Sequence, residues 1–168
     1  NQTLTAILKD CSPSMGGIIE AMFANKEDVQ EVTLADDMVN AITMASSKKF
    51  VKFQFARNTG SMSSNYTIDP TTGVKFVTTD LVLVFNRMET SKRVAIKALM
   101  ENGLVAIVKD ANGKYWYLGY DEALNATAGD GLTGTARADR NGYSATLQDN
   151  SHEMPYEVSP EIVAALVA

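Results

Sequence analysis

The stretch "SMSSNYTIDPTTGVKFVTTDLVLVF", residues 61–85, consists of two strand-like runs separated by a turn. The turn is predicted at residues 69–73, because proline fixes the backbone angle φ early in it and glycine accepts a left-handed conformation at its end. The two runs therefore predict a long β-hairpin, whose arm covers approximately residues 57–80. At its base, residues 81–85 form an apolar run that is typical of a strand covered on both faces.

The distal runs of this hairpin, residues 61–68 and 74–79, are polar and rich in serine and threonine. Because they carry few apolar side chains, we expect that neither face of the arm is buried in the core of its own subunit. Such an arm either stands in solvent or lies on another chain.

Short β-prone runs separated by Gly, Asn, Asp and Pro make the rest of the chain mainly β. Strands are predicted over residues 18–24, 29–34 and 39–44. In the third of these, a helix over residues 36–46 competes with the strand, and β-branched residues after a turn favour the strand. Residues 49–56 alternate most regularly and predict a half-buried strand, with Phe50, Lys52 and Gln54 on one face and Val51, Phe53 and Phe55 on the other.

A second hairpin is predicted in "GLVAIVKDANGKYWYLGYDE", residues 103–122, around Asn112-Gly113. Asn-Gly favours a type I′ turn, which needs positive φ at both central residues. This turn pairs Ala111 with Lys114, Lys109 with Trp116 and Ile107 with Leu118, so that the lysine stem lies along the indole. The pattern favours a structural role for Trp116, the one tryptophan of the chain.

Two helices are expected. Residues 90–103 predict the longer one, with Thr90 or Ser91 as its cap, Gly103 as a left-handed stop, and an apolar stripe of Val94, Ile96, Ala98, Leu99 and Met100. A short C-terminal helix over approximately residues 160–167 has Ser159 as its cap and Pro160 at its first position. Two turns do not hold together alone in water, so its apolar side chains need a surface, which a neighbouring subunit could provide. Between the helices, residues 125–149 are rich in glycine and predict short or bulged strands around residues 130–131 and 141–142.

The length of 168 residues predicts one domain, residues 1–168, with a substantial core. No apolar run approaches the roughly 20 residues that span a bilayer, and no secretory signal is readable, so we expect synthesis in the cytoplasm and no membrane contact. The net charge of −5 disfavours tight binding to nucleic acid, which depends on neutralised phosphates. Cys11 is the one cysteine and is expected to be a small buried apolar residue.

The residues that usually carry chemistry are few in this chain. His152 is the one histidine, it is expected on the surface, and with a single cysteine it makes no typical zinc site. A serine triad lacks its Gly-x-Ser-x-Gly elbow, and no phosphate-binding loop precedes a helix. Adjacent carboxylates such as Asp36-Asp37 do not converge as a glycosidase pair needs. We therefore predict no catalytic, cofactor or metal site, and a protein that is not an enzyme.

The order of these elements resembles the tail-tube-like structural proteins of phages that infect Bacteroidetes, including the tail and ring proteins of crAss-like phages. The resemblance extends from about residue 16 to residue 158, and it depends on the order of turns and strands rather than on any single motif. The stretches that carry it are "GGIIEAMFANKEDV" (16–29), "KFVKFQFARNTGSMSSNYTIDPTTGVKFVTTDLVLVFNRM" (49–88), a single helix, "LVAIVKDANGKYWYLG" (104–119), and "RNGYSATLQD" (140–149) followed by "PYEV" (155–158).

The resemblance implies a mainly β fold, a β-sandwich or small barrel, with one packed α-helix and a long hairpin that reaches the adjacent subunit. It also implies a virion subunit of a tail tube or a neck or tail ring, commonly sixfold, as a hexamer or a dodecamer. Such a ring contacts adjacent tail or neck proteins and surrounds a channel through which DNA passes without specific binding. Pairing with a neighbour's strand edge would satisfy the backbone of the arm. The residues predicted to make this contact are Ser61, Met62, Tyr66, Ile68, Pro70, Val74, Phe76 and Val77.

Two other functions fit parts of the pattern. A small β-rich binding module for carbohydrate or protein ligands would use an aromatic stacking surface of Tyr115, Trp116 and Tyr117. An enzyme with an unrecognised site is the third hypothesis, and His152 is the residue with which we would test it. The sequence favours the structural subunit.

Overall fold

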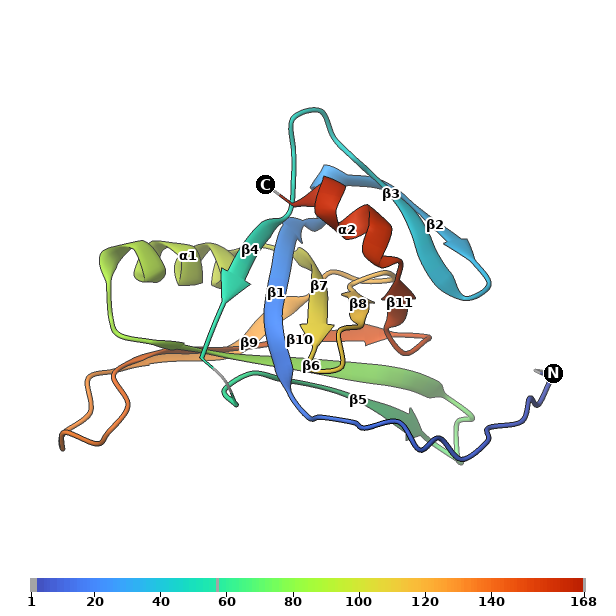
Figure 1. The fold of residues 1–168 in the computed structure, drawn as a ribbon, viewed down its shortest axis with the longest axis horizontal. Coiled ribbons are helices and arrows are strands. Elements are labelled where there is room, and N and C mark those ends of the chain that lie inside the picture. The colour runs from blue at the N-terminus through green and yellow to red at the C-terminus, as the bar shows by residue number, and fades with distance from the viewer. Residues whose placement is uncertain (1–2, 57, 168) are drawn as a thin grey trace.

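The chain folds into two β-sheets and two α-helices in a computed structural model that describes residues 3–56 and 58–167 (Figure 1). The seven-stranded sheet has the order β2-β3-β11-β8-β7-β1-β4, and the four-stranded sheet has the order β5-β6-β10-β9. The predicted mainly β fold is confirmed. The described residues form two sheets, and neither closes into a barrel.

The strands of the larger sheet are β1 (Ile18–Asn25), β2 (Val29–Ala35), β3 (Met38–Met44), β4 (Val51–Gln54), β7 (Leu104–Asp110), β8 (Tyr115–Leu118) and β11 (Tyr156–Val158). The strands of the smaller sheet are β5 (Ser61–Ile68), β6 (Lys75–Asn86), β9 (Asn125–Leu132) and β10 (Gly142–Ser151). A 3-10 turn, η1 (Lys26–Asp28), follows β1, and the helices are α1 (Thr90–Glu101) and α2 (Pro160–Leu166).

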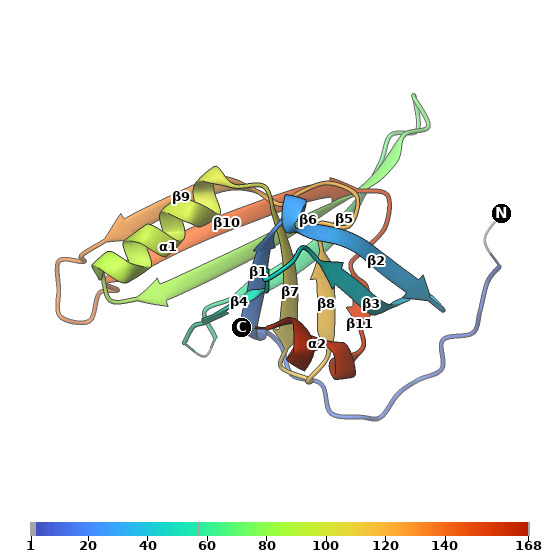
Figure 2. The same ribbon diagram turned by 90° about the horizontal axis from the view of Figure 1, so that it is seen from above.

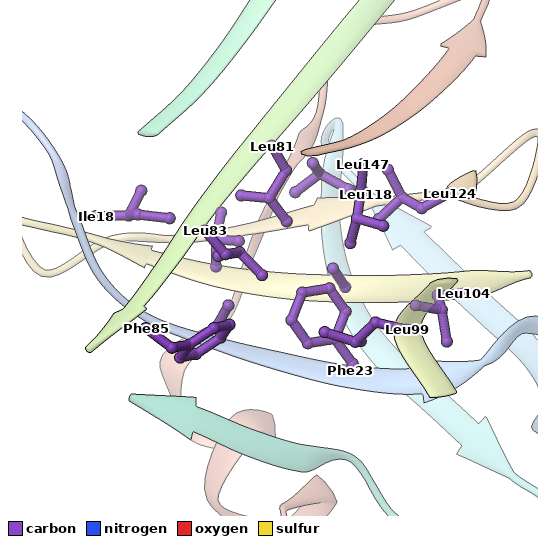
Figure 3. Packing of buried hydrophobic residues seen from close by; sticks show 13 residues of the cluster. Ile18, Phe23, Leu81, Leu83, Phe85, Leu99, Leu104, Leu118, Leu124 and Leu147 are labelled. Carbon is purple, nitrogen blue, oxygen red and sulfur yellow. The ribbon is translucent and has the colours of Figure 1, made fainter. Parts of the chain in front are cut away.

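The two sheets pack against each other around a first apolar core (Figure 3). From the smaller sheet, alternate residues of β6 enter this core, and β10 adds Leu147. From the larger sheet, β1, β7 and β8 contribute the facing side chains. Its fully or nearly fully buried members include Phe23, Leu81, Leu83, Phe85, Leu99, Leu104, Leu118, Leu124 and Leu147.

A second apolar core lies on the other face of the larger sheet, under α2 and the β2–β3 hairpin. Strand β7 belongs to both cores, because its side chains alternate between the two faces. Leu104, Ala106 and Val108 enter the first core, while Val105 and Ile107 enter the second, and all five are buried.

Three sequence predictions of strands are confirmed by β1, β2 and β3. Residues 38–44 form a strand rather than a helix, and Asp36 and Asp37 have φ values of 52° and 59°, which join β2 to β3 in a tight left-handed turn. Strand β4 is shorter than predicted. The predicted faces are confirmed, since Phe53 and Phe55 pack against the first core and Phe50 is buried in the second, although Val51 is 54% exposed.

Helix α1 closes one end of the sandwich, with its middle over the first core and its last turn beside β9 (Figure 2). Three details of the prediction are wrong. Glu89 is the N-cap residue, without a side-chain hydrogen bond, and the helix ends through Asn102 in an extended conformation rather than at a left-handed Gly103. Val94 is 55% exposed and lies off the apolar stripe, which Leu99 and Ile96 make.

Helix α2 has the surface that its apolar side chains were predicted to need, and its own chain supplies this surface rather than a neighbouring subunit. Val163 and Leu166 are buried in the second core. The Phe50 N–H donates a hydrogen bond to the Leu166 carbonyl at 2.9 Å, which ties the end of α2 to the start of β4. Pro160 occupies the first turn as predicted, but Ser159 makes no side-chain cap.

The β7–β8 hairpin has a register one residue different from the prediction. The Gly113 N–H donates to the Asp110 carbonyl at 3.1 Å, and Gly113 has φ of 87°, whereas Asn112 is not left-handed. This is a type I turn followed by a bulge. Val108 therefore pairs with Trp116, and Lys109 pairs with Tyr115, so the lysine lies over the Tyr115 ring rather than along the indole.

Two further expectations differ from the structure. Strands β9 and β10 pair regularly at residues 130–131 and 142, where bulges were predicted, and their register shift lies at Thr146/Leu147 instead. Strand β10 is also longer than expected, with 10 residues. Cys11 is exposed, so its predicted burial is wrong.

Candidate functional site

The base of the predicted arm belongs to the body of its own subunit. Strand β6 lies between β5 and β10, and its pairing with β10 runs from Asn86 out to Val77 opposite Ser151. Val77 is completely buried, and Thr79 is 1% exposed. The expectation that neither face of the arm is anchored is therefore wrong for this part. A polar residue is accommodated because the Thr79 hydroxyl forms a hydrogen bond with Ser64 at 3.0 Å.

The tip of the hairpin, residues 66–76, extends beyond the body (Figure 2). Within it, β5 and β6 pair only with each other, since the last β10 partner is opposite Val77. The turn at the end is well defined: the Gly73 N–H donates to the Asp69 carbonyl at 2.8 Å, and Gly73 has φ of 73°. The Asp69 carboxylate accepts the Thr71 N–H at 2.9 Å, and the hydrogen bonds from Thr71 and Thr72 lower the pKa of Asp69.

Apolar side chains are exposed on both faces of this tip. Tyr66 and Ile68 lie on the face that continues from the first core, and they are 51% and 59% exposed. Val74, which is 51% exposed, lies on the opposite face with the half-buried Phe76. We call Tyr66, Ile68, Val74 and Phe76 the tip patch.

The residues predicted for the assembly arm thus fall into two groups. Met62 packs against the first core and Val77 is buried in the body, so neither is available to a partner. Ser61 is exposed at the base of β5. Pro70 is exposed in the turn, and the tip patch supplies the other predicted residues. The predicted start of the arm, residue 57, lies outside the described residues.

The aromatic surface predicted around Trp116 does not form. Trp116 is half-buried against the first core, and its Nε1–H donates to the Asp110 carboxylate at 3.0 Å. Tyr115 and Tyr117 lie on the opposite face of the sheet, beside the second core, and Tyr117 is 1% exposed. The three rings therefore share no surface on which a sugar could stack.

A buried polar cluster at the junction of β8 and β10 was not predicted from the sequence. Asp149 is 5% exposed and accepts the Gly119 N–H at 3.0 Å. Its second oxygen and the Tyr117 hydroxyl have no hydrogen-bond partner, beside a cavity of about 10 Å³. Burial raises the pKa of Asp149. The Lys26 ammonium donates to the Gly119 and Tyr120 carbonyls at 2.5 and 2.7 Å, and desolvation lowers its pKa.

This cluster fixes the connection between the sheets and is too small for an organic ligand. Among residues 3–56 and 58–167, no three His, Cys, Asp or Glu side chains gather in a way that would hold a metal ion. His152 is exposed, and its backbone N–H donates to Asp121. No helix in the described part of the chain is long and apolar enough to cross a bilayer.

Comparison of the chain with protein-family models, with curated proteins and with solved structures finds no match. The resemblance to phage tail-tube proteins therefore stays a prediction, and the candidate site depends on the geometry of the hairpin tip alone.

Proposed function

We propose that the chain is a structural subunit of a phage tail tube or neck ring, which joins copies of itself through the tip patch around a channel for DNA. The observation that carries the proposal is the tip itself. Tyr66 and Ile68 on one face and Val74 on the other are each more than half exposed, on a hairpin that projects beyond the body. A tip with exposed apolar side chains on both faces suits insertion between parts of a neighbouring molecule, because such insertion would bury the side chains of both faces.

The shape of the tip supports the same use. Its turn is held by backbone and Asp69 hydrogen bonds, so little conformational entropy remains to be lost on binding. Strand β5 is an edge strand, which offers unpaired backbone groups to a neighbour. The charge supports a channel: a net charge of −5 disfavours adhesion of DNA phosphates to the protein.

Sedimentation velocity of matched variants tests this proposal. Val74→Asp places a charge in the tip patch, while Val94→Asp makes the same change on α1 at a nearly equal exposure of 55% rather than 51%. We expect the wild-type chain and Val94→Asp to sediment as a closed oligomer, and Val74→Asp to sediment as a monomer. Equal behaviour of the two variants would remove the tip from the proposed interface.

A further inference from the structure

The segment of residues 3–17 contributes no buried side chain to the body of the subunit. Its residues are all exposed, and Leu4, Ile7 and Leu8 are 98%, 97% and 83% exposed. The segment is tied to the body near its end, where the Asn112 side chain accepts the Met15 N–H at 2.9 Å and the Ala111 N–H donates to Gly17. From there it runs away from α1 and β4, and its far end lies on the other side of the molecule in both views (Figures 1 and 2).

The order of residues in this segment fits an added β-strand. In an extended chain, alternate side chains share a face, so Leu4, Ala6, Leu8 and Asp10 point to the same side. This side is apolar over five residues and then acidic. A surface that receives it should have an apolar floor, space for two leucines, and a cation at one end.

A groove with these properties lies between β4 and α1. Its volume is about 410 Å³, and Phe23, Phe53 and Leu99 provide apolar side chains in it. The helix side is formed by the small residues Ala95 and Ala98, which leave room for larger side chains. Lys48 and Lys49 also line the groove, with Asp28, so the net charge of these three lining residues is positive and complements Asp10.

The strand beside the groove has a free edge. Strand β4 is the last strand of the larger sheet. The Phe50 N–H on its outer side is already bonded to Leu166, and because successive backbone groups alternate in direction, the groups of Lys52 and Gln54 point to the same open side. An added strand can therefore pair with β4 beyond the bridge that Val167 makes with Phe50.

We propose that residues 4–10 of one copy add to the β4 edge of a second copy, with Leu4 and Leu8 in the groove against α1 and Asp10 near Lys48 and Lys49. This contact is head-to-tail, since donor and receiver surfaces differ, and such contacts close into rings or extend into tubes. The inference deepens the proposed assembly, because it names a second contact between copies that is separate from the tip patch.

Disulfide cross-linking tests the contact with the full chain. Cys11 is the one native cysteine and is exposed, directly after Asp10. In the variant Lys49→Cys, the thiol at position 49 would lie near Cys11 of the neighbouring copy, and diamide would oxidise the two thiols to one disulfide. Lys97→Cys on the solvent side of α1, at 64% side-chain exposure, is the matched control.

The expected result is a ladder of covalent oligomers with Lys49→Cys, no ladder beyond random dimer with Lys97→Cys, and loss of the ladder when Leu4→Asp and Leu8→Asp are added. Thr3→Asp with Thr5→Asp, which adds the same charge to the other side of the segment, should keep the ladder. A monomer with an internal disulfide, or no cross-link above the control, would overturn the inference.

The failure of this inference is distinguishable from the failure of the proposed function. We expect the ladder to persist in an Ile68→Asp background, where the proposed tip contact is removed. Cross-linking there reports on the segment alone, because oxidation traps even a transient contact, whereas sedimentation of the tip variants reports on whether the assembled oligomer needs the tip patch.

Discussion

Replacing Val77 by alanine tests whether the base of the hairpin is part of the subunit's own core. Val77 is completely buried between Tyr66 on β5 and Ser151 on β10, although it lies in a polar, threonine-rich stretch. The substitution removes roughly two buried carbon groups, at about 0.8 kcal/mol each. The residual cavity adds to this loss, so we expect the free energy of unfolding to fall by about 2 kcal/mol.

Val74→Ala is the matched control, because it makes the same change in the same hairpin at a side chain that is 51% exposed. Its effect should stay below about 0.5 kcal/mol. Both changes remove the same two carbon groups from a valine side chain, so the difference between them measures mainly burial.

Urea unfolding of the monomer, at a concentration where sedimentation shows a single species, provides the measurement. With a slope of about 2 kcal/mol per molar urea, Val77→Ala should lower the midpoint by about 1 M, whereas Val74→Ala should hardly move it. Equal midpoints for the two variants would refute the account, since they would mean that the whole arm is detached from the core.

Three further predictions concern stability. Burial raises the folded-state pKa of Asp149, so this carboxyl stabilises the fold most below its unfolded pKa of about 3.9, and its contribution declines as the pH rises through the folded-state pKa. The free energy of unfolding of the wild-type chain, relative to that of Asp149→Asn, should therefore fall between acid and neutral pH. A difference that stays constant or rises would contradict this. Gly142→Ala would place a Cβ atom in collision with the Phe85 carbonyl oxygen, so thermal unfolding should show a loss of several kcal/mol or no folded protein, and a wild-type melting temperature would refute the close approach. The double change Asp36→Asn and Asp37→Gly suits the two positive φ values of the β2–β3 turn and should raise the free energy of unfolding by up to about 1 kcal/mol. A lower free energy of unfolding, measured with a chemical denaturant, would show that the turn has another conformation.

Local patterns in the sequence were sufficient to predict strands β1, β2 and β3, the turn at residues 69–73 and the approximate positions of both helices. Alternation of apolar side chains and turn residues act over a few positions, and for this reason β1, β2 and β3 lie where they were predicted. A helix over residues 36–46 competed with a strand over residues 39–44, and the β-branched residues correctly predicted the strand.

The errors came from contacts between distant parts of the chain. The burial of Val77 and Thr79 depends on β10, which lies about 70 residues away and pairs with β6 in a register that no local pattern contains. The surface for α2 is likewise supplied by β3 and Phe50 of the same chain rather than by a neighbour. Threonine side chains read as polar in the sequence, yet Thr79 is buried because Ser64 satisfies its hydroxyl.

The register of the β7–β8 hairpin shows a different limit. Asn-Gly is compatible with a type I′ turn and with a type I turn followed by a bulge. The Asp110 carboxylate accepts the N–H groups of Asn112 and Lys114 at 2.9 and 3.0 Å, which stabilises the bulged form. Asp110, just before the turn, thus selects the turn type, and as a result the cross-strand partner of Trp116 is Val108 rather than Lys109.

The candidate site was predicted only in part. The exposed apolar residues Tyr66, Ile68 and Val74 were among the predicted arm residues, because the turn at residues 69–73 marks the tip. No local pattern indicates where the arm leaves the body, because this point is set by the end of β10 at Ser151. The cluster around Asp149 was missed for the same reason, since it joins β8 to β10.

The proposed assembly through the hairpin tip can be tested most directly by cryo-electron microscopy of the concentrated wild-type protein. The account predicts closed rings or tubes in which Ile68, 59% exposed in the isolated subunit, is buried against a neighbouring copy. Particles that remain monomeric at high concentration, or rings in which Ile68 still faces solvent, would contradict it.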